Sequence, residues 1–306
     1  MSPLDGSGFL SFHQDELAAQ SLAGQGAGRA AIRPFMPDQH RAFFALLPQL
    51  FTATLDARGW PMASVLTGEK GFVHSPDPST LRISALPAAD DPAASGFIMG
   101  AEIGLIGLDF TTRRRNRANG RVIATDGGLI VRIAQSFGNC AQYIQSRTSG
   151  PREPIRTSRE DLGALDDDAR ALIASADTFF VASRSRPEAG ADGGLDMSHR
   201  GGRPGFVGVL GDTLAIPDFR GNRFYNTLGN LLGDPRAGLI FIDFAAGDIL
   251  QIQGTVAIDW HPDGGPTGAE RLWRVKVERA WRRRGAFPFT WTFGDYAPTT
   301  LRTGVW

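Results

Sequence analysis

The stretch GLIFIDF at residues 238–244 repeats the stretch GLIGLDF at residues 104–110, which lies 134 positions earlier. The triplet GFV occurs at residues 71–73 and again at residues 205–207, with the same offset. The same offset also relates Gly254 to Gly120 and Val256 to Val122. Several anchors with one spacing predict a domain-sized unit that occurs twice, since the repeats of solenoid proteins are much shorter.

Both copies have the pattern of a series of short strands. The apolar run at residues 104–110 is bounded by turn formers and predicts a buried strand. Near the C-terminus, Trp273, Val275 and Val277 alternate with charged residues, which is the period of a half-buried strand. Many short strands with glycine-rich turns and few helices favour antiparallel barrels.

Changes in composition along the chain predict its organisation. One helix is expected to begin near Pro37 and another to cover residues 166–176. The polar, proline-containing stretch before the second helix indicates a linker between the copies. The expected units are an N-terminal extension (1–36), a first barrel (37–150), a linker (151–165) and a second barrel (166–306).

The overall composition excludes several classes of partner. Acidic and basic residues balance at 32 each, so no net charge favours nucleic acid or an anionic membrane. No segment has the length and apolarity of a membrane span or signal peptide. Cys140 is the single cysteine, which excludes an intrachain disulfide and favours a cytoplasmic setting. The five histidines show no metal-ligand spacing, so no metal is predicted.

The turn at residues 198–205 is a first candidate site. Ser198, His199 and Arg200 precede two glycines, which would let a ligand approach the backbone closely while Arg200 donates to it. A tight turn with solvated arginines explains the pattern equally well.

The segment at residues 217–230 is a second candidate. A Gly-Asn-Arg turn that leads into a helix can bind a phosphate through free N–H groups, the helix dipole and Arg223. The alternative is a solvated turn in which Asn222 caps the helix. The first copy has Asp90 and Asp91 in the corresponding stretch, and their charge predicts that only the second copy binds the anion.

Two polar segments of the first copy are absent from the second. Residues 113–117 contain four arginines, of which Arg115 and Arg117 would lie on the same face of a strand. Residues 136–145 contain Cys140 among polar side chains, and a lone cysteine is more often packed than nucleophilic. These segments are either solvated or complete the site of the second copy.

The motifs of the second copy resemble a known family in both content and order. They run from Asp196-Met197-Ser198-His199-Arg200-Gly201-Gly202 through residues 204–207, 216–223 and 226–231 to 234–239. They resemble the pyridoxamine 5′-phosphate oxidase-like, FMN-binding split-barrel family, over most of residues 165–260. The resemblance implies a mainly β protein with flanking helices. It would have two tandem antiparallel Greek-key split β-barrels that form an intrachain pseudo-dimer, with a degenerate first copy.

In this family FMN lies between two barrels, so the resemblance implies one FMN between the two copies. The patterns and the resemblance together predict these cofactor-binding residues: Ser198, His199, Arg200, Pro217, Asp218, Arg220, Asn222, Arg223, Thr227, Asn230, Arg115 and Arg117. His199 is the candidate catalytic residue. The Ser-Arg-Lys run of true pyridoxamine phosphate oxidases is replaced by Arg220-Gly221-Asn222-Arg223, so vitamin B6 oxidation is not expected.

The expected function is therefore that of an FMN-dependent oxidoreductase acting on a small molecule, with a reductase as a possible electron-transfer partner. Two alternatives remain open. One is a flavin carrier or sensor without turnover, and the other is a haem-binding or haem-degrading split barrel in which a histidine reaches iron. The chain would act as a monomeric pseudo-dimer or as a homodimer.

Overall fold

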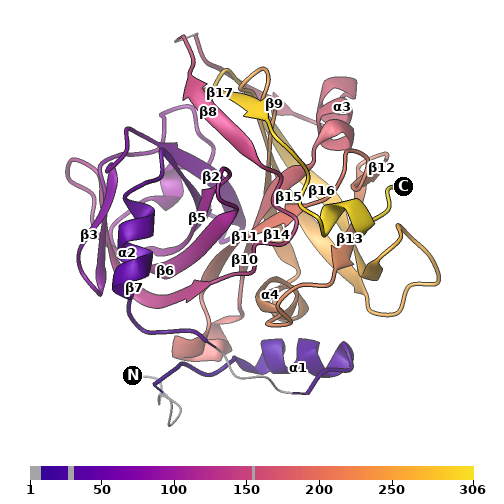
Figure 1. Ribbon diagram of the computed structural model, residues 1–306, viewed down its shortest axis with the longest axis horizontal. Coiled ribbons are helices and arrows are strands. Elements are labelled where there is room, and N and C mark those ends of the chain that lie inside the picture. The colour runs from indigo at the N-terminus through magenta and orange to yellow at the C-terminus, as the bar shows by residue number, and fades with distance from the viewer. Residues whose placement is uncertain (1–7, 27–30, 154–155) are drawn as a thin grey trace.

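The computed structural model describes residues 8–26, 31–153 and 156–306, and its two large antiparallel sheets lie side by side (Figure 1). The strands of the first sheet follow the order β2-β1-β5-β6-β7-β4-β3. Their bounds are β1 Gln49–Leu55, β2 Pro61–Thr67, β3 Val73–Asp77, β4 Thr80–Ile83, β5 Glu102–Asp109, β6 Arg114–Ala124 and β7 Leu129–Gly138.

The second sheet follows the order β11-β10-β14-β15-β16-β13-β12. Its strands are β10 Thr178–Arg184, β11 Leu195–Gly201, β12 Gly208–Leu210, β13 Thr213–Phe219, β14 Arg236–Ile242, β15 Ile249–Asp259 and β16 Ala269–Arg284. When the strands are matched in chain order, the two sheets have the same connectivity. The prediction of a mainly β fold with two tandem antiparallel units is confirmed.

Four α-helices flank the sheets in the part of the chain that the structure describes. They are α1 Gln14–Leu22, α2 Asp38–Phe44, α3 Asp167–Ser175 and α4 Asn226–Gly233. The helices expected near Pro37 and over 166–176 correspond to α2 and α3. None of the helices among the described residues is long and apolar enough to cross a membrane.

The stretch expected to be a linker also contains regular structure. Strand β9 Ser158–Leu162 pairs with β16 and extends the second sheet. Just before it, β8 Arg147–Pro151 pairs with the C-terminal strand β17 Phe289–Phe293. The sequence does not predict β9 as a strand, because all five of its residues are at least partly exposed and polar residues of this kind are also typical of a linker.

Equivalent residues meet where the two sheets pack together. Phe51 of β1 and Phe180 of β10 stack, with ring centroids 3.5 Å apart. Their neighbours Ile106 and Ile240 are related by the 134-residue offset. Contact between the same position of both copies is the arrangement of an isologous dimer interface. The two copies are therefore related by a pseudo-twofold axis near this stack.

The packing explains why glycines mark the repeat. A Cβ atom on Gly104 would lie 2.6 Å from the carbonyl oxygen of Leu195, and one on Gly238 would lie 2.5 Å from that of Pro61. Leu195 and Pro61 are themselves equivalent positions, at the starts of β11 and β2. Each glycine allows the edge strand of the other copy to approach the sheet in which the glycine lies. A side chain at either glycine would push the two sheets apart.

Each sheet encloses its own apolar cluster, and a third cluster lies between the sheets. The third cluster contains Phe51, Ile106, Phe180 and Ile240, and it is fully buried at these positions. Because this shared core fixes one copy against the other, side chains on β6 of the first sheet can meet β11 of the second at defined positions.

Candidate functional site

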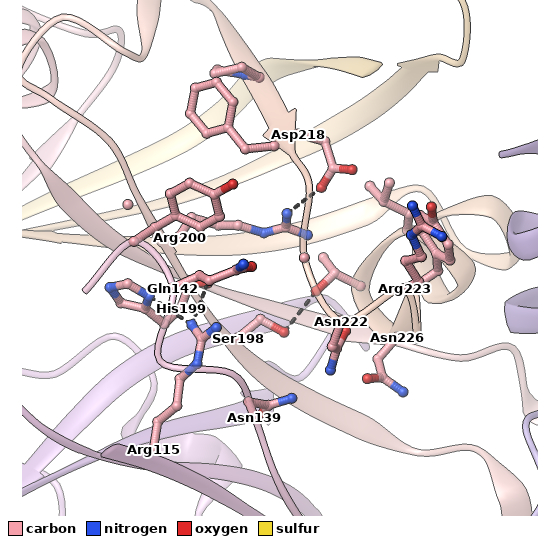
Figure 2. A pocket seen from close by; sticks show the side chains of 18 of the residues that line it. Arg115, Asn139, Gln142, Ser198, His199, Arg200, Asp218, Asn222, Arg223 and Asn226 are labelled. Atoms are coloured by element: carbon pink, nitrogen blue, oxygen red, sulfur yellow. Dashed lines mark hydrogen bonds and ion pairs between the residues drawn. The ribbon is translucent and has the colours of Figure 1, made fainter. Parts of the chain in front are cut away.

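A pocket lies at the junction of the two sheets, beside the start of α4. Figure 2 shows the side chains that line it. The first copy supplies Arg115 and Arg117 from β6 and three residues of the segment that follows β7: Asn139, Gln142 and Tyr143. The second copy supplies most of the remaining lining from β11, from β13 and from the turn that leads into α4. Ten of the twelve predicted cofactor-binding residues line it: Arg115, Arg117, Ser198, His199, Arg200, Pro217, Asp218, Asn222, Arg223 and Thr227.

Arg117 joins the two copies beneath the pocket. Only 7% of its surface is exposed. Its Nη2 donates to Ser198 Oγ at 2.6 Å, and its Nη1 lies 3.5 Å from Asp196 Oδ1 and 3.4 Å from Asn226 Oδ1. All three partners belong to the second copy. Arg117 is thus a buried cation with one carboxylate partner and two polar ones.

Arg115 has no carboxylate partner among the described residues. Its Nη1 lies 2.9 Å from His199 Nδ1, and its Nε is shut off from solvent without a hydrogen-bond acceptor. Burial, together with the neighbouring charges of Arg117 and Arg200, lowers the pKa of Arg115 to about 9. The guanidinium is still protonated at neutral pH, so the pocket holds a positive charge that the protein does not balance.

His199 is neutral, and its contacts fix its tautomer. Burial lowers its pKa well below 6.5, and the charges of Arg115 and Arg200 act in the same direction. Because arginine only donates hydrogen bonds, His199 Nδ1 must accept from Arg115, and the ring proton then lies on Nε2. That Nε2–H is buried and has no partner in the described structure.

Helix α4 points an uncapped N-terminus toward the pocket. Its N-cap residue, Tyr225, has a left-handed backbone (φ 59°) and makes no side-chain capping bond. Asn222 accepts instead from the N–H of Phe224, so the alternative in which Asn222 caps the helix is wrong. The first N–H groups of a helix have no partner within it, and they attract an anion.

Ser198 and Thr227 form a hydroxyl pair beside this helix end. Thr227 Oγ1 donates to Ser198 Oγ at 2.7 Å, and Arg117 donates to the same oxygen. Ser198 therefore accepts two hydrogen bonds, and no described acceptor takes its own hydrogen. The pair offers one hydroxyl donor to a ligand.

A carboxylate orders two further arginines of the pocket. Asp218 accepts from Arg200 through Oδ1 and from Arg271 Nε through Oδ2, the latter at 2.8 Å. Asp218 is 5% exposed, and Arg271 also pairs with Glu270. These charges are largely balanced within the protein, so Asp218 positions cations rather than contacting a phosphate.

The structure places two predicted residues outside the pocket. The side chain of Asn230 points inward, where it bonds to His13, Ser183 and Asp196. Arg220 does not line the pocket, although its carbonyl oxygen accepts from Tyr143. Arg223 lies before α4, which begins only at Asn226, so Arg223 does not share a helix face with Asn226, Thr227 and Asn230.

Several site residues were not found from the sequence. Tyr225 and Arg271 line the pocket without any local motif. Glu16 of α1 reaches Asn226 at the start of α4, where Asn226 Nδ2 donates to it, and it also accepts from the N–H of His13 at 3.0 Å. The N-terminal extension therefore contributes to the wall behind the pocket, and its sequence carries no signal for this contact.

Glu16 is expected to make the stability of the protein depend on pH. Burial, with the nearby charge of Asp196, raises its pKa from 4.5 to about 8, while Asn226, His13 and Arg117 oppose the shift. The folded state then holds a proton that the unfolded state releases, so the contribution of Glu16 to stability falls as pH rises from about 4.5 to 8. The slope is at most about 1.4 kcal/mol per pH unit for one proton.

Urea denaturation of the wild type and of Glu16→Gln at several pH values measures this effect. The glutamine cannot ionise and keeps one of the two oxygens that accept from His13 and Asn226. The lost acceptor costs the same at every pH, so the difference in unfolding free energy should still grow in favour of the glutamine variant above pH 5. Parallel pH profiles for the two proteins would contradict the assignment of a neutral Glu16.

The counterpart of the pocket in the first copy is filled by the protein itself. Ser64 corresponds to Ser198, and its hydroxyl donates to the carboxylate of Asp91. Gln251 and Arg283 donate to the same carboxylate at 3.0 and 3.1 Å. An internal anion thus occupies the place that the second copy leaves open beside Ser198.

Among the described residues, no group of three His, Cys, Asp or Glu side chains could hold a metal ion. Cys140 is exposed next to the pocket-lining Asn139.

No protein-family model matches the chain, and no curated protein matches its sequence. Among solved structures, it is similar to HupZ of Group A Streptococcus at 16% identity, over 38% of this chain and 91% of that one, with a TM-score of 0.29. It is also similar to an FAD-binding protein of Mesorhizobium loti at 13% identity, over 41% and 96% of the two chains, with a TM-score of 0.28. Similarities this low carry no argument about activity.

Proposed function

We propose that the pocket binds FMN between the two sheets and that the protein is an FMN-dependent oxidoreductase acting on a small molecule. The observation that carries this proposal is the cation of Arg115, which has no carboxylate partner among the described residues, in a pocket where several other buried polar atoms also lack partners. Unbalanced buried charge and unsatisfied polar groups destabilise a protein, and a ligand that pairs with them removes the cost.

One side of the pocket fits a phosphate. The uncapped start of α4, the free hydroxyl hydrogen of the Ser198–Thr227 pair and Arg223 at the rim all offer donors. Such a set of donors is typical of phosphate sites at helix N-termini. Arg223 is exposed and donates to Gln25 at 2.7 Å, so its share of the binding energy should be smaller than that of the buried donors.

The other side fits the pyrimidine edge of a flavin, on which an N–H lies between two carbonyl groups. Figure 2 shows Arg115, Gln142 and His199 gathered there, away from Asn222 and Arg223. Arg115 Nε and His199 Nε2–H are donors without acceptors, while Asn139 Oδ1 and Gln142 Oε1 are acceptors without donors. The unpartnered atoms thus offer both types of group that this edge requires.

Bound FMN would supply the hydride or electron transfer, and the protein would position it and tune its charge. Arg115 would stabilise negative charge on the ligand from a site of low solvent exposure. Since the pKa of His199 lies well below 6.5, it would act at neutral pH as a hydrogen-bond donor through Nε2, and not as a general acid. The candidate catalytic residue of the sequence thus receives a binding role in this proposal.

The visible spectrum of the purified protein tests the proposal, followed by release and quantification of the cofactor. We expect flavin absorbance and one FMN per chain, because Asp91 already fills the equivalent position in the first copy. A Soret band would indicate haem instead, and two FMN molecules per chain would contradict the role of Asp91. Bound FMN that no reductant or oxidant turns over would indicate a carrier or sensor.

A further inference from the structure

The N-terminal segment contacts the outer side of the turn at residues 223–226, which leads into α4. Gln25 accepts from Arg223 Nη1 at 2.7 Å, and Gln20 donates to the carbonyl oxygen of Phe224 at 3.4 Å. The rings of Phe12 and Phe224 meet edge to face, with centroids 5.3 Å apart. With the bond between Glu16 and Asn226 included, the segment contacts three residues of this turn, which are Arg223, Phe224 and Asn226.

This turn has a backbone that needs support. Arg223 (φ 63°) and Tyr225 (φ 59°) both adopt the left-handed conformation, which is unfavourable for residues with a side chain. Such a turn keeps its shape only where surrounding contacts impose it. The hydrogen bond of Asn222 supports it from within, and the N-terminal segment supplies the contacts on the other side.

The segment itself is anchored at some distance from the turn. Asp15 pairs with Arg186, whose Nε donates to Asp15 Oδ2 at 2.7 Å. Helix α1 also packs closely on α4, since a Cβ on Gly229 would lie 2.7 Å from the Cα of Glu16. Figure 1 shows α1 lying alongside α4 at the edge of the molecule. The segment can therefore transmit its position to the start of α4.

We propose that residues 12–25 form a strap whose docking is coupled to ligand binding in the pocket, with Phe12 and Glu16 as positioning residues. The coupling follows from the shared turn: the strap holds residues 223–226 in the conformation that aims the helix N-terminus at the anion. By reciprocity, an anion bound there must in turn strengthen the docking of the strap. The identity of the ligand in this inference rests on the proposed function.

Phe12→Ala tests the strap, because it removes the ring contact with Phe224 without touching the pocket. We expect its affinity for FMN to fall about tenfold, within the usual range of coupling between sites. Riboflavin, which lacks the phosphate, should lose less affinity. Leu22→Ala is the matched control, since Leu22 lies on the same segment with 43% of its surface exposed. Equal FMN affinities for the two variants would overturn the proposal.

Hydrogen–deuterium exchange of the full chain tests the coupling directly. We expect faster exchange at residues 223–226 in ligand-free Phe12→Ala than in Leu22→Ala, and slower exchange over α1 of the wild type when FMN is added. If the wild type does not bind FMN, the proposed function fails, but the ligand-free comparison still decides whether the strap orders the turn. If Phe12→Ala does not fold, Gln25→Ala takes its place, since it removes the contact with Arg223. It must then show weaker FMN binding and faster exchange at residues 223–226.

Discussion

Arg115→Met is expected to stabilise the ligand-free protein and to weaken FMN binding. Its guanidinium has no carboxylate partner in the described structure, and it lies close enough to Arg117 and Arg200 for their charges to lower its pKa. Replacing such a charge by an apolar side chain removes an unpaired cation, and it also leaves His199 Nδ1 without its donor, so the unfolding free energy should rise by no more than about 1 kcal/mol. Loss of a charge-assisted contact should weaken FMN binding by about 2 kcal/mol, roughly thirtyfold.

Urea denaturation without ligand and a fluorescence titration with FMN measure the two effects. Arg114→Met is the control on the same strand, because Arg114 is exposed and its guanidinium lies 4.9 Å from the ring centroid of Phe43, away from the pocket. Opposite changes in stability and affinity would be the signature of a residue kept for binding. A loss of stability in Arg115→Met would show that the residue serves the fold.

Arg117→Met is expected to destabilise the protein strongly, although Arg117 is only two residues from Arg115 on the same strand. Removing its guanidinium leaves Asp196 with amide partners alone in a region where it is 7% exposed, and it leaves Ser198 with one donor fewer. Breaking a buried pair from one side typically costs about 3–5 kcal/mol. FMN binding should also fall, since Ser198 and Asn226 lose the group that orders them.

The double variant Arg117→Met/Asp196→Asn separates the two causes. Removing the carboxylate as well should recover part of the lost unfolding free energy, because no buried charge is then left without its partner. A double variant no more stable than Arg117→Met would mean that packing, and not charge, explains the loss. Arg121→Met, at an exposed position of the same strand, should stay within about 0.5 kcal/mol of the wild type.

The two-copy organisation could be predicted because its markers are local. Gly104 and Gly238 lie in apolar strands, and no side chain fits where the opposite copy's edge strand crosses them. The shared offset therefore reflects packing between the copies, although the glycines that mark it can be recognised in the sequence alone. Strand β9 was missed for the opposite reason: its exposed residues resemble a linker, and only pairing with β16 makes it a strand.

The predicted residues line the pocket where they are contiguous in the sequence. Ser198, His199 and Arg200 share one strand, so their residue types alone indicated a polar site. Asn230 is predicted to bind the cofactor, but its side chain bonds within the protein, and the local sequence cannot show whether a polar helix face meets solvent or a buried network. Here that face meets His13 and Asp196, which lie far away in the sequence.

By itself the sequence determined the β class, the repeat and the polar turns of the second copy, because period, glycine position and turn chemistry act over a few residues. Only the tertiary structure decided that Arg115 faces His199, that Asp91 fills the counterpart site and that Glu16 reaches Asn226. These contacts join residues 27 to 210 positions apart. Their formation depends on how the two sheets and α1 pack, and no local pattern records that packing.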